Sequence, residues 1–219
     1  VLGIGPVSDA FFVAFKLPNL FRRLTAEGAM TSAFIPGYTG VEQSEGKKAA
    51  QCLAGEIQTM LVWVLLLILV VFEIFMPYVI TAMAPGFAID ADASRFDGGI
   101  HLARLTMPYL PMVSLLALWI AIGNVYGRFA LGASMPVIMN IVMISGAFLA
   151  WYMWPDLNQD GVGYDRAAII AISVASGGVI KLLVIGTMLW RKKSLPPIYF
   201  FPRLSQNSRT LWRRFWPAA

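Results

Sequence analysis

The sequence has 219 residues, of which 58% are hydrophobic and only 13% are charged, and its mean hydropathy is +0.68. A soluble globular domain carries about 25% charged residues, so this composition excludes an ordinary soluble protein and indicates an integral membrane protein. The net charge of +5 does not indicate nucleic acid binding, because the basic residues lie beside hydrophobic segments, where they set membrane topology.

Five segments are candidates for crossing a bilayer, which takes about 20 mostly apolar residues in a helix. In chain order they cover about 7–35, 57–84, 102–122, 135–154 and 167–190. Turn signals at Ala84-Pro85-Gly86 and Gly123-Asn124 separate neighbouring segments. We therefore predict an all-α fold, a polytopic membrane helical bundle that crosses the bilayer about five times.

The predicted loops alternate in charge along the chain. Aspartates dominate the loops at 85–99 and 155–165, whereas lysine and arginine mark the loops at 37–56 and 123–134 and the tail from Arg191. The loop at 37–56 also carries three glutamates. The positive-inside rule predicts that these two loops and the tail lie in the cytoplasm, with the aspartate-rich loops outside.

The first segment is unusual because it carries charges among its apolar residues: Asp9, Lys16, Arg22, Arg23 and Glu27. Such charges are costly in a membrane helix and usually face a protein interior or a water-filled cavity. All except Arg22 fall within roughly 40° of one face of an ideal helix, at about 100° per residue. Arg22 is about 100° from its neighbour, and a kink expected at Pro18 disturbs the phase. The pattern predicts a polar cavity wall that binds an anion.

A position at the membrane interface competes with a functional role for several of these charges. Arg22 and Arg23 could equally snorkel to the cytoplasmic interface, and that alternative stays open, whereas function is favoured for Asp9 and Lys16. Three further residues, Glu73, Lys181 and Arg104, are explained more simply by positions near an interface.

The sequence offers little for metal or cofactor chemistry. His101 is the only histidine and Cys52 the only cysteine, which excludes a His-based metal site or a disulfide within the chain. A calcium-loop beginning, D-x-N-x-D-G from Asp156 to Gly161, lacks the closing glutamate because Ala167 occupies that position, so a plain polar loop is favoured. Without a recognisable enzyme motif, we predict no catalytic residue and no cofactor.

The stretch from Gly5 to Ala29, continued by Ser32-Ala33-Phe34-Ile35-Pro36, resembles the signature of the MurJ (MviN) family of lipid II flippases. Further resemblances to that family occur at Ala84-Pro85-Gly86-Phe87, Pro108-Tyr109, Asn124 to Phe129, Pro136 to Asn140 and Gly177-Gly178.

The resemblance implies a fourteen-helix transporter of the multidrug/oligosaccharidyl-lipid/polysaccharide exporter superfamily, in the bacterial inner (plasma) membrane. Residues 1–219 would be its N-terminal lobe: the end of helix one, helices two to six, and the approach to helix seven. The implied partners are membrane lipids and the substrate lipid II, a polyprenyl diphosphate-linked disaccharide-pentapeptide that is flipped outward by alternating access. Family residues that match Asp9 and Arg22 line the central cavity, and the position of Glu27 belongs to the cytoplasmic gate.

Three rival classes remain. Another exporter of the superfamily could move other lipid-linked oligosaccharides or drugs, although a cationic-drug exporter would need a cavity dominated by carboxylates. A membrane enzyme acting on polyprenyl phosphates would need acid–base clusters, and a scaffold would need no charges in its first segment. Because the chain starts at Val1 and ends within what resembles an incoming helix, at 215–219, we expect it to be part of a longer protein.

Overall fold

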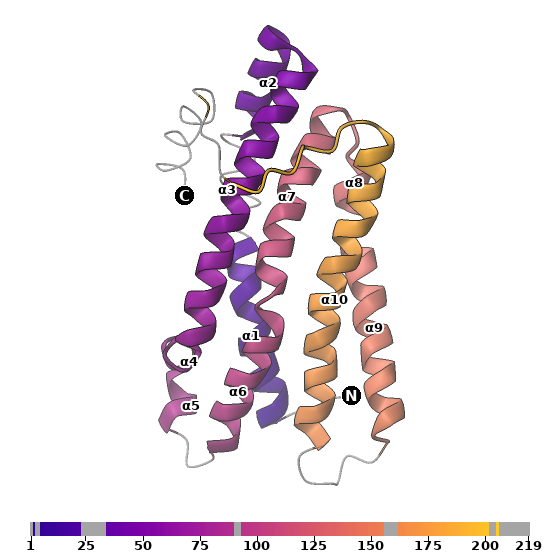
Figure 1. The fold of residues 1–219 in the computed structure, drawn as a ribbon. Helices are drawn as coiled ribbons and strands as arrows, with labels where there is room; N and C mark the ends of the chain where they lie inside the picture. Colours follow the sequence, from indigo (N-terminus) through magenta and orange to yellow (C-terminus); the bar gives the residue numbers. More distant parts are fainter. Residues whose placement is uncertain are drawn as a thin grey trace. The chain divides into compact units, whose positions relative to one another are not determined.

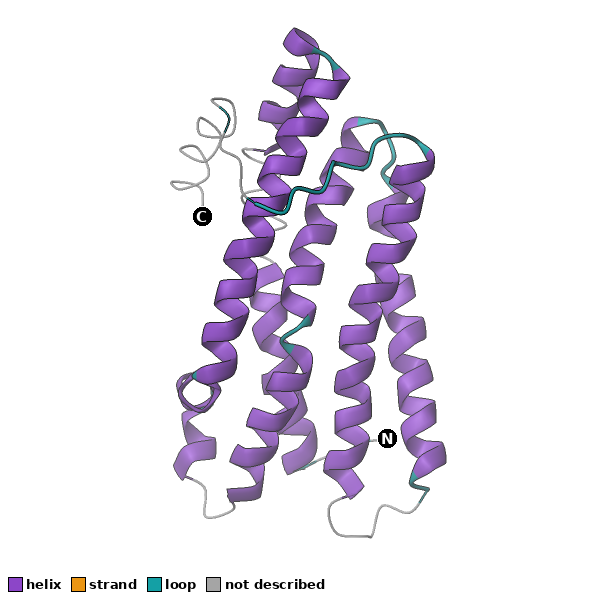
Figure 2. Cartoon of the chain, viewed as in Figure 1, coloured by secondary structure: helices purple, strands orange, loops and turns teal. Residues whose placement is uncertain are grey.

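The structure is a computed structural model that describes residues 2, 5–22, 34–89, 93–155, 162–201 and 205. Within these ranges every regular element is a helix (Figure 2). Figure 1 labels the helices in chain order: α1 Pro6–Arg22, α2 Ile35–Glu45, α3 Lys47–Ile74, α4 Met76–Met83, α5 Pro85–Ile89, α6 Ala93–Thr106, α7 Tyr109–Val125, α8 Ala130–Ala133, α9 Met135–Met153 and α10 Val162–Arg191. The predicted all-α architecture is confirmed.

Four stretches of helix in the described ranges are long and apolar enough to cross a membrane: Lys47–Ile74, Ser94–Val125, Ala130–Met153 and Val162–Arg191. They correspond to four of the five predicted segments, with earlier starts than the sequence indicated. The fifth, α1, has 17 described residues and falls short of the about 20 that a crossing requires. The remainder of that segment, from residue 23 to 33, lies outside the described residues, so a fifth crossing stays a prediction.

The expected loop at 37–56 is wrong, because α2 and the first turns of α3 occupy it. Pro36 lies in the first turn of α2, where its missing N–H costs nothing. Gly46 closes this helix, donating its N–H to the carbonyl of Glu42 at 3.0 Å with φ of +87°, a conformation that glycine adopts without strain. Helix α3 begins directly after Gly46. The polar residues of 37–56 therefore belong to helices that are partly exposed, and not to a loop.

Helix also replaces much of the predicted loop at 85–99, through α5 and the first turns of α6. Prolines explain why the chain breaks into short helices in this region. Pro77 follows the break between α3 and α4 at Phe75, and Pro108 lies between α6 and α7. A proline lacks the N–H that would bond four residues back and crowds that carbonyl, so the regular ladder is interrupted at each of these positions.

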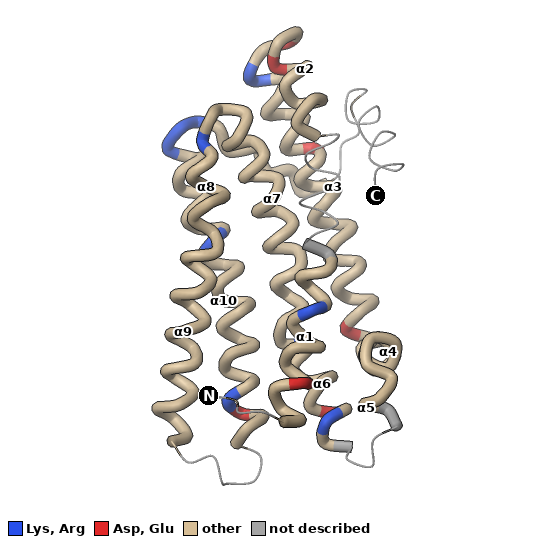
Figure 3. Tube along the Cα trace, turned by 180° about the vertical axis from the view of Figure 1, so that it is seen from behind, with Lys and Arg blue, Asp and Glu red and all other residues tan. Residues whose placement is uncertain are grey.

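The chain divides into two compact units. Unit 1 comprises Val1–Leu20, Ile68–Leu110 and Pro136–Ile180, and unit 2 comprises Phe21–Leu67, Pro111–Met135 and Lys181–Ala219. The segments of unit 1 contain eight acidic and four basic residues, whereas those of unit 2 contain four acidic and thirteen basic residues. The charged residues are spread unevenly over the helices. Helix α9, in unit 1, carries no charged residue along its length (Figure 3).

Within unit 1, a buried arginine joins the end of α9 to the start of α10. Arg166 is 1% exposed, and its guanidinium donates a hydrogen bond to the backbone carbonyl of Trp154. The last carbonyls of a helix have no partner in their own helix, and a basic side chain both satisfies them and suits the negative end of the helix dipole. Arg166 therefore has a structural role, because it links the end of α9 to the first turns of α10.

Candidate functional site

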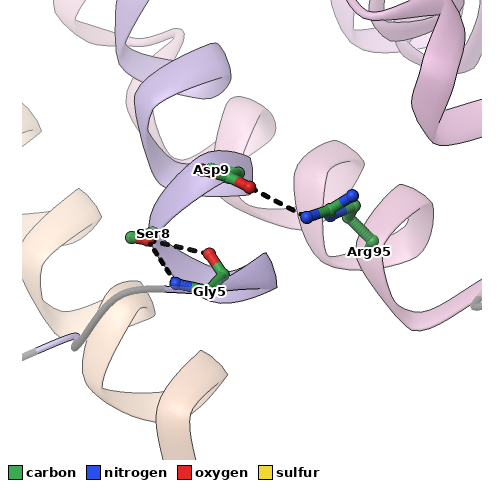
Figure 4. Close-up of polar contacts among 4 residues, drawn as sticks. All are labelled: Gly5, Ser8, Asp9 and Arg95. Carbon is green, nitrogen blue, oxygen red and sulfur yellow. Dashed lines mark hydrogen bonds and ion pairs between the residues drawn. The ribbon is translucent and has the colours of Figure 1, made fainter.

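The start of α1 is fixed by its own sequence. Pro6 occupies the first helical turn, and Ser8 Oγ accepts a hydrogen bond from the N–H of Gly5 at 3.1 Å and donates to the carbonyl of Gly5 at 2.8 Å (Figure 4). The N–H groups at the start of a helix have no carbonyl partner within the helix. The Ser8 hydroxyl supplies an acceptor for one of them, that of Gly5. Asp9 follows directly, in the first turn, where the positive end of the helix dipole favours a carboxylate.

Two faces of α1 differ in burial. Four residues, Ala10, Phe11, Ala14 and Leu17, are at most 4% exposed and pack into unit 1. A second face, formed by Asp9, Phe12, Lys16 and Leu20, is exposed. Asp9 and Lys16 are seven residues apart, or about two turns, so they share this face as helical geometry requires. The exposed face mixes one acid and one base with two large apolar side chains.

Asp9 makes an ion pair with α6. Its Oδ2 accepts a hydrogen bond from Nη2 of Arg95 at 2.8 Å, and the two side chains are 53% and 26% exposed (Figure 4). The guanidinium carbon of Arg95 also lies 5.3 Å from the centre of the Phe87 ring, within the range of a cation–π contact. The Phe87 ring and the Asp9 carboxylate therefore both contact the guanidinium of Arg95.

A second contact from α6 involves Pro18 of α1. Because Pro18 has no N–H, the carbonyl of Ala14 lacks its usual helical donor. The fully buried hydroxyl of Thr106 lies 3.2 Å from that carbonyl and 3.0 Å from the carbonyl of Ala103, and can donate its hydrogen to either. The helix continues through Pro18 to Arg22, so this contact helps an interrupted helix to remain helical inside unit 1.

The same device recurs near Glu73. Pro77 leaves the Glu73 carbonyl without its helical donor, and Nη2 of Arg104 donates to that oxygen at 3.3 Å. Nε of Arg104 also lies 3.8 Å from Oε2 of Glu73. We expected Arg104 to act as an interfacial anchor, and the structure adds that its charge faces Glu73. Helix α6 thus supplies an arginine to each of two acids on other helices of unit 1.

In unit 2, aromatic hydroxyls connect α2 to the turn after α7. Tyr126 donates to Oε1 of Glu42 at 2.8 Å, and its hydroxyl lies 3.1 Å from that of Tyr38. Burial is the main cause that raises the pKa of Tyr38, and burial together with these hydrogen bonds raises the pKa of Tyr126. Lys47 Nζ and the guanidinium of Arg128 lie 5.0 and 5.7 Å from the centre of the Tyr126 ring. Both tyrosines stay neutral at physiological pH.

The structure describes only part of the predicted site. It places Asp9 and Lys16 on one exposed face of α1, and it places the backbone of Arg22 at the end of that helix. Arg23 and Glu27 lie outside the described residues, as does the calcium-like loop from 156 to 161. Sequence reasoning missed Arg95, because the loop expected at 85–99 gave no reason to pair it with a residue 86 positions away.

Comparison with known proteins identifies the family. The family model for lipid II flippase MurJ matches residues 1–219, the whole chain. The chain belongs to the MurJ family. Among relatives of the MurJ family, a probable lipid II flippase MurJ of Rhizobium meliloti (strain 1021) is 35% identical over all 219 residues, and that of Rhizobium tropici is 37% identical. The lipid II flippase MurJ of Burkholderia cenocepacia is 33% identical over 182 residues, which cover 83% of this chain and 33% of that protein.

The fold agrees with this family. A solved structure described as lipid II flippase MurJ in an inward closed conformation matches 99% of the chain with a TM-score of 0.73, at 22% identity, over 41% of its own length. The chain spans 39% of the length of the two rhizobial MurJ relatives. Together with the four apolar helices, membership of the MurJ family makes this chain a multi-pass membrane protein. The resemblance noted in the sequence is confirmed.

Proposed function

We propose that this chain is the N-terminal part of a lipid II flippase, which moves the lipid-linked peptidoglycan precursor from the cytoplasmic to the outer leaflet by alternating access. The observation that carries the proposal is the match of the MurJ family model over all 219 residues, supported by relatives that bear the same name. Because the chain spans 39% of the first relatives, transport is assigned to the full-length protein.

The chemistry of the first helix supports a substrate that carries a diphosphate. Arginine presents a planar fork of donors that matches phosphate oxygens, and Arg22 ends the helix whose exposed face carries Lys16. Arg95 neutralises Asp9, so this carboxylate does not oppose an anion that binds to the basic residues of α1. We propose that Arg22 contacts the diphosphate, with Arg23 and Glu27 completing the site and Asp9 and Lys16 lining the cavity.

The remaining assignments follow from the same proposal. The protein transports rather than catalyses, needs no cofactor, and resides in the bacterial inner membrane, where lipid II is its partner. Residues 1–219 are proposed to hold the end of helix one, helices two to six and the approach to helix seven. The basic end of α10, at Arg191, is proposed to lie in the cytoplasm, and the start of α10, with the acidic sequence that precedes Val162, outside.

The test uses the full-length protein in a bacterium depleted of its own lipid II flippase. Expression should restore growth and should return lipid II to the outer leaflet, where an impermeant reagent detects it. An exporter of drugs or of other lipid-linked sugars would be present in the membrane without restoring either readout. Normal membrane levels with no outer-leaflet lipid II would therefore reject the proposed substrate.

A further inference from the structure

After α10 the chain becomes extended and runs beside α3 within unit 2. The turn out of the helix uses Lys193, whose φ is +51°, and the N–H groups of Lys193 and Ser194 bond back to the carbonyls of Trp190 and Leu189 at 2.9 Å each. Ser194 is fully buried and Pro196 is buried. We call residues 194–201 the strap. It contains no helix, although it directly follows a candidate membrane span.

Side chains along one row of α3 contact backbone carbonyls of the strap. Gln51 donates to the carbonyl of Lys193 at 2.7 Å, and Trp63 Nε1 donates to the carbonyl of Phe200 at 3.1 Å. Between them, the Thr59 hydroxyl lies 3.2 Å from the carbonyl of Tyr199 and 2.8 Å from that of Gly55 in its own helix, and it can donate its one hydrogen to either. Residues 51, 55, 59 and 63 are spaced by four, so they form one row along the helix. Gln51 and Trp63 therefore each donate to a backbone carbonyl of the strap or of the residue before it, and Thr59 lies within reach of a third.

The fourth member of the row is Gly55, and its lack of a side chain makes room for the strap. A Cβ at this position would lie 2.5 Å from the carbonyl oxygen of Pro197 and 2.9 Å from Cε2 of Tyr199. Real Cβ atoms do not approach other atoms so closely, so any larger residue would push the strap away. The row therefore combines two donors to the strap, Gln51 and Trp63, with a hydroxyl that the strap shares with α3 and with one position, Gly55, that has no side chain.

The strap faces outward with large apolar side chains. Ile198, Phe200 and Phe201 are 77%, 85% and 73% exposed, whereas Tyr199 is turned toward Gly55. Successive side chains of an extended chain point to opposite sides, which explains the alternation from 198 to 200. Exposed phenylalanines on a segment that makes its polar contacts elsewhere suit an apolar medium rather than water.

The position of the contacts sets the depth of the strap. The uncharged run of α3 begins at Ile57, and Trp63 lies six residues further, a rise of about 9 Å. Non-helical backbone at such a depth is tolerated only where its polar groups have partners. Here Pro196 and Pro197 have no N–H to satisfy, and donors of α3 take carbonyls of the strap.

We propose that the strap is a re-entrant lipid-contact segment: seated on the row Gln51, Gly55, Thr59 and Trp63, it inserts Ile198, Phe200 and Phe201 into the acyl side of the membrane interface. Three consecutive basic residues, Arg191, Lys192 and Lys193, precede it and are exposed. Their charge complements anionic lipid headgroups, so the segment pairs a cationic end with an apolar end, as interfacial anchors do. Phosphatidylglycerol is a lipid of the required chemistry.

The test measures depth on the full-length protein in nanodiscs of phosphatidylglycerol and phosphatidylethanolamine, starting from a cysteine-free variant in which Cys52 and any other cysteine are replaced by alanine. A fluorophore on Phe200→Cys should be quenched strongly by nitroxide-labelled acyl chains and several-fold less by aqueous iodide than the same fluorophore on Lys192→Cys. Equal iodide quenching at both positions would place the strap in water. Protection of position 200 from both quenchers would show that protein covers it. Either result overturns the proposal.

Two variants test the seat on α3. Gly55→Ala should displace the strap, so that position 200 loses lipid quenching and gains iodide quenching, although alanine favours a helix over glycine. The matched control is Gly40→Ala, because an added Cβ at Gly40 meets nothing within 4 Å. Thr59→Val combined with Trp63→Phe removes two donors without adding volume and should act in the same direction. Unchanged quenching in both variants, at normal membrane levels, would reject α3 as the seat.

Discussion

The two units of the chain hold their polar groups in different ways. In unit 1, α6 sends Arg95 to Asp9 and Arg104 to Glu73, so opposite charges on different helices meet. In unit 2, the contacts that join α3 to α7 and to the strap use neutral donors, such as Trp119 Nε1, which donates to Gln58 Oε1 at 2.8 Å. Unit 1 is also acidic in sequence, with eight acidic residues against four basic, and unit 2 is basic, with thirteen against four.

This difference separates two tasks of charge in a membrane protein. Excess lysine and arginine in unit 2 fits retention of its loops in the cytoplasm, which depends on the number of basic residues rather than on their contacts. The pairs of unit 1 instead depend on geometry, because a charge near the membrane needs a partner or water. The neutral contacts of α3 with α7 and with the strap add no such cost, and the charged groups of Glu42, Lys47 and Arg128 gather instead around Tyr126, after the end of α7. The two kinds of contact should respond differently to substitution and to salt.

The largest expected effect concerns topology and is all-or-none. In a Cys52→Ala background, Asp165→Cys at the start of α10 should react with an impermeant reagent in intact cells, and Lys192→Cys just after its end should not. Both positions are exposed in the structure. Permeabilised cells supply the control, where both should react. Labelling of Lys192→Cys alone in intact cells would invert the proposed orientation.

The next largest effect is expected at the two ends of α10. Arg166→Met removes a buried donor and leaves the Trp154 carbonyl without it, so the free energy of unfolding should fall by about 3 kcal/mol. Arg191→Met, at an exposed position near the other end, should change it by about 0.5 kcal/mol or less. Unfolding in mixed micelles measures both. Similar losses for the two variants would contradict the distinction between a buried cap and an exposed charge.

A neutral contact in unit 2 should show an intermediate effect. Trp119→Phe leaves the buried Gln58 carbonyl without its donor and should cost about 1 kcal/mol of unfolding free energy. Adding Gln58→Leu should recover part of the loss, because replacing both partners by apolar groups is nearly neutral. The loss should not change with salt. If the double variant were less stable than Trp119→Phe alone, the stabilising effect of Trp119 would not come from this hydrogen bond.

The smallest effect is expected for the pair of Asp9 and Arg95. Its side chains are 53% and 26% exposed, so the coupling in a double-mutant cycle with Asp9→Asn and Arg95→Gln should be about 1 kcal/mol or less. Unlike the contact of Trp119, it should shrink as salt is raised. Unfolding measured at low and high ionic strength tests this. A coupling that is larger and independent of salt would mean that the pair is far better shielded than its exposure indicates.

Hydropathy predicted the helical fold because a long apolar run forms a helix in a membrane whichever helices pack beside it. Hydropathy did not predict α2, because the polar residues of this helix resemble those of a loop. Pro36 and Gly46, which mark its two ends, were the local signals for a helix. Helical periodicity likewise placed Asp9 and Lys16 on one face of α1.

Contacts between distant residues could not be predicted in this way. Arg95 and Asp9 are 86 positions apart, and no periodicity connects them. The docking of the strap on α3 joins residues about 140 apart, and only the proline pair at 196–197 signalled that helix would not continue. Arg22 and Arg23 stay a prediction, because snorkelling and substrate contact require the same residues at the same end of a helix.

The most direct test of the central claim is Arg22 in the flippase-depletion assay, using full-length protein with membrane levels measured alongside. A charge-assisted phosphate contact is worth about 1.5–3 kcal/mol, so Arg22→Ala should abolish growth. Arg22→Lys should impair it partly, because lysine keeps the charge and loses the fork. Normal growth with Arg22→Ala at normal levels would contradict the account. Arg23→Ala would then be the next variant, and its silence would leave snorkelling as the role of both arginines.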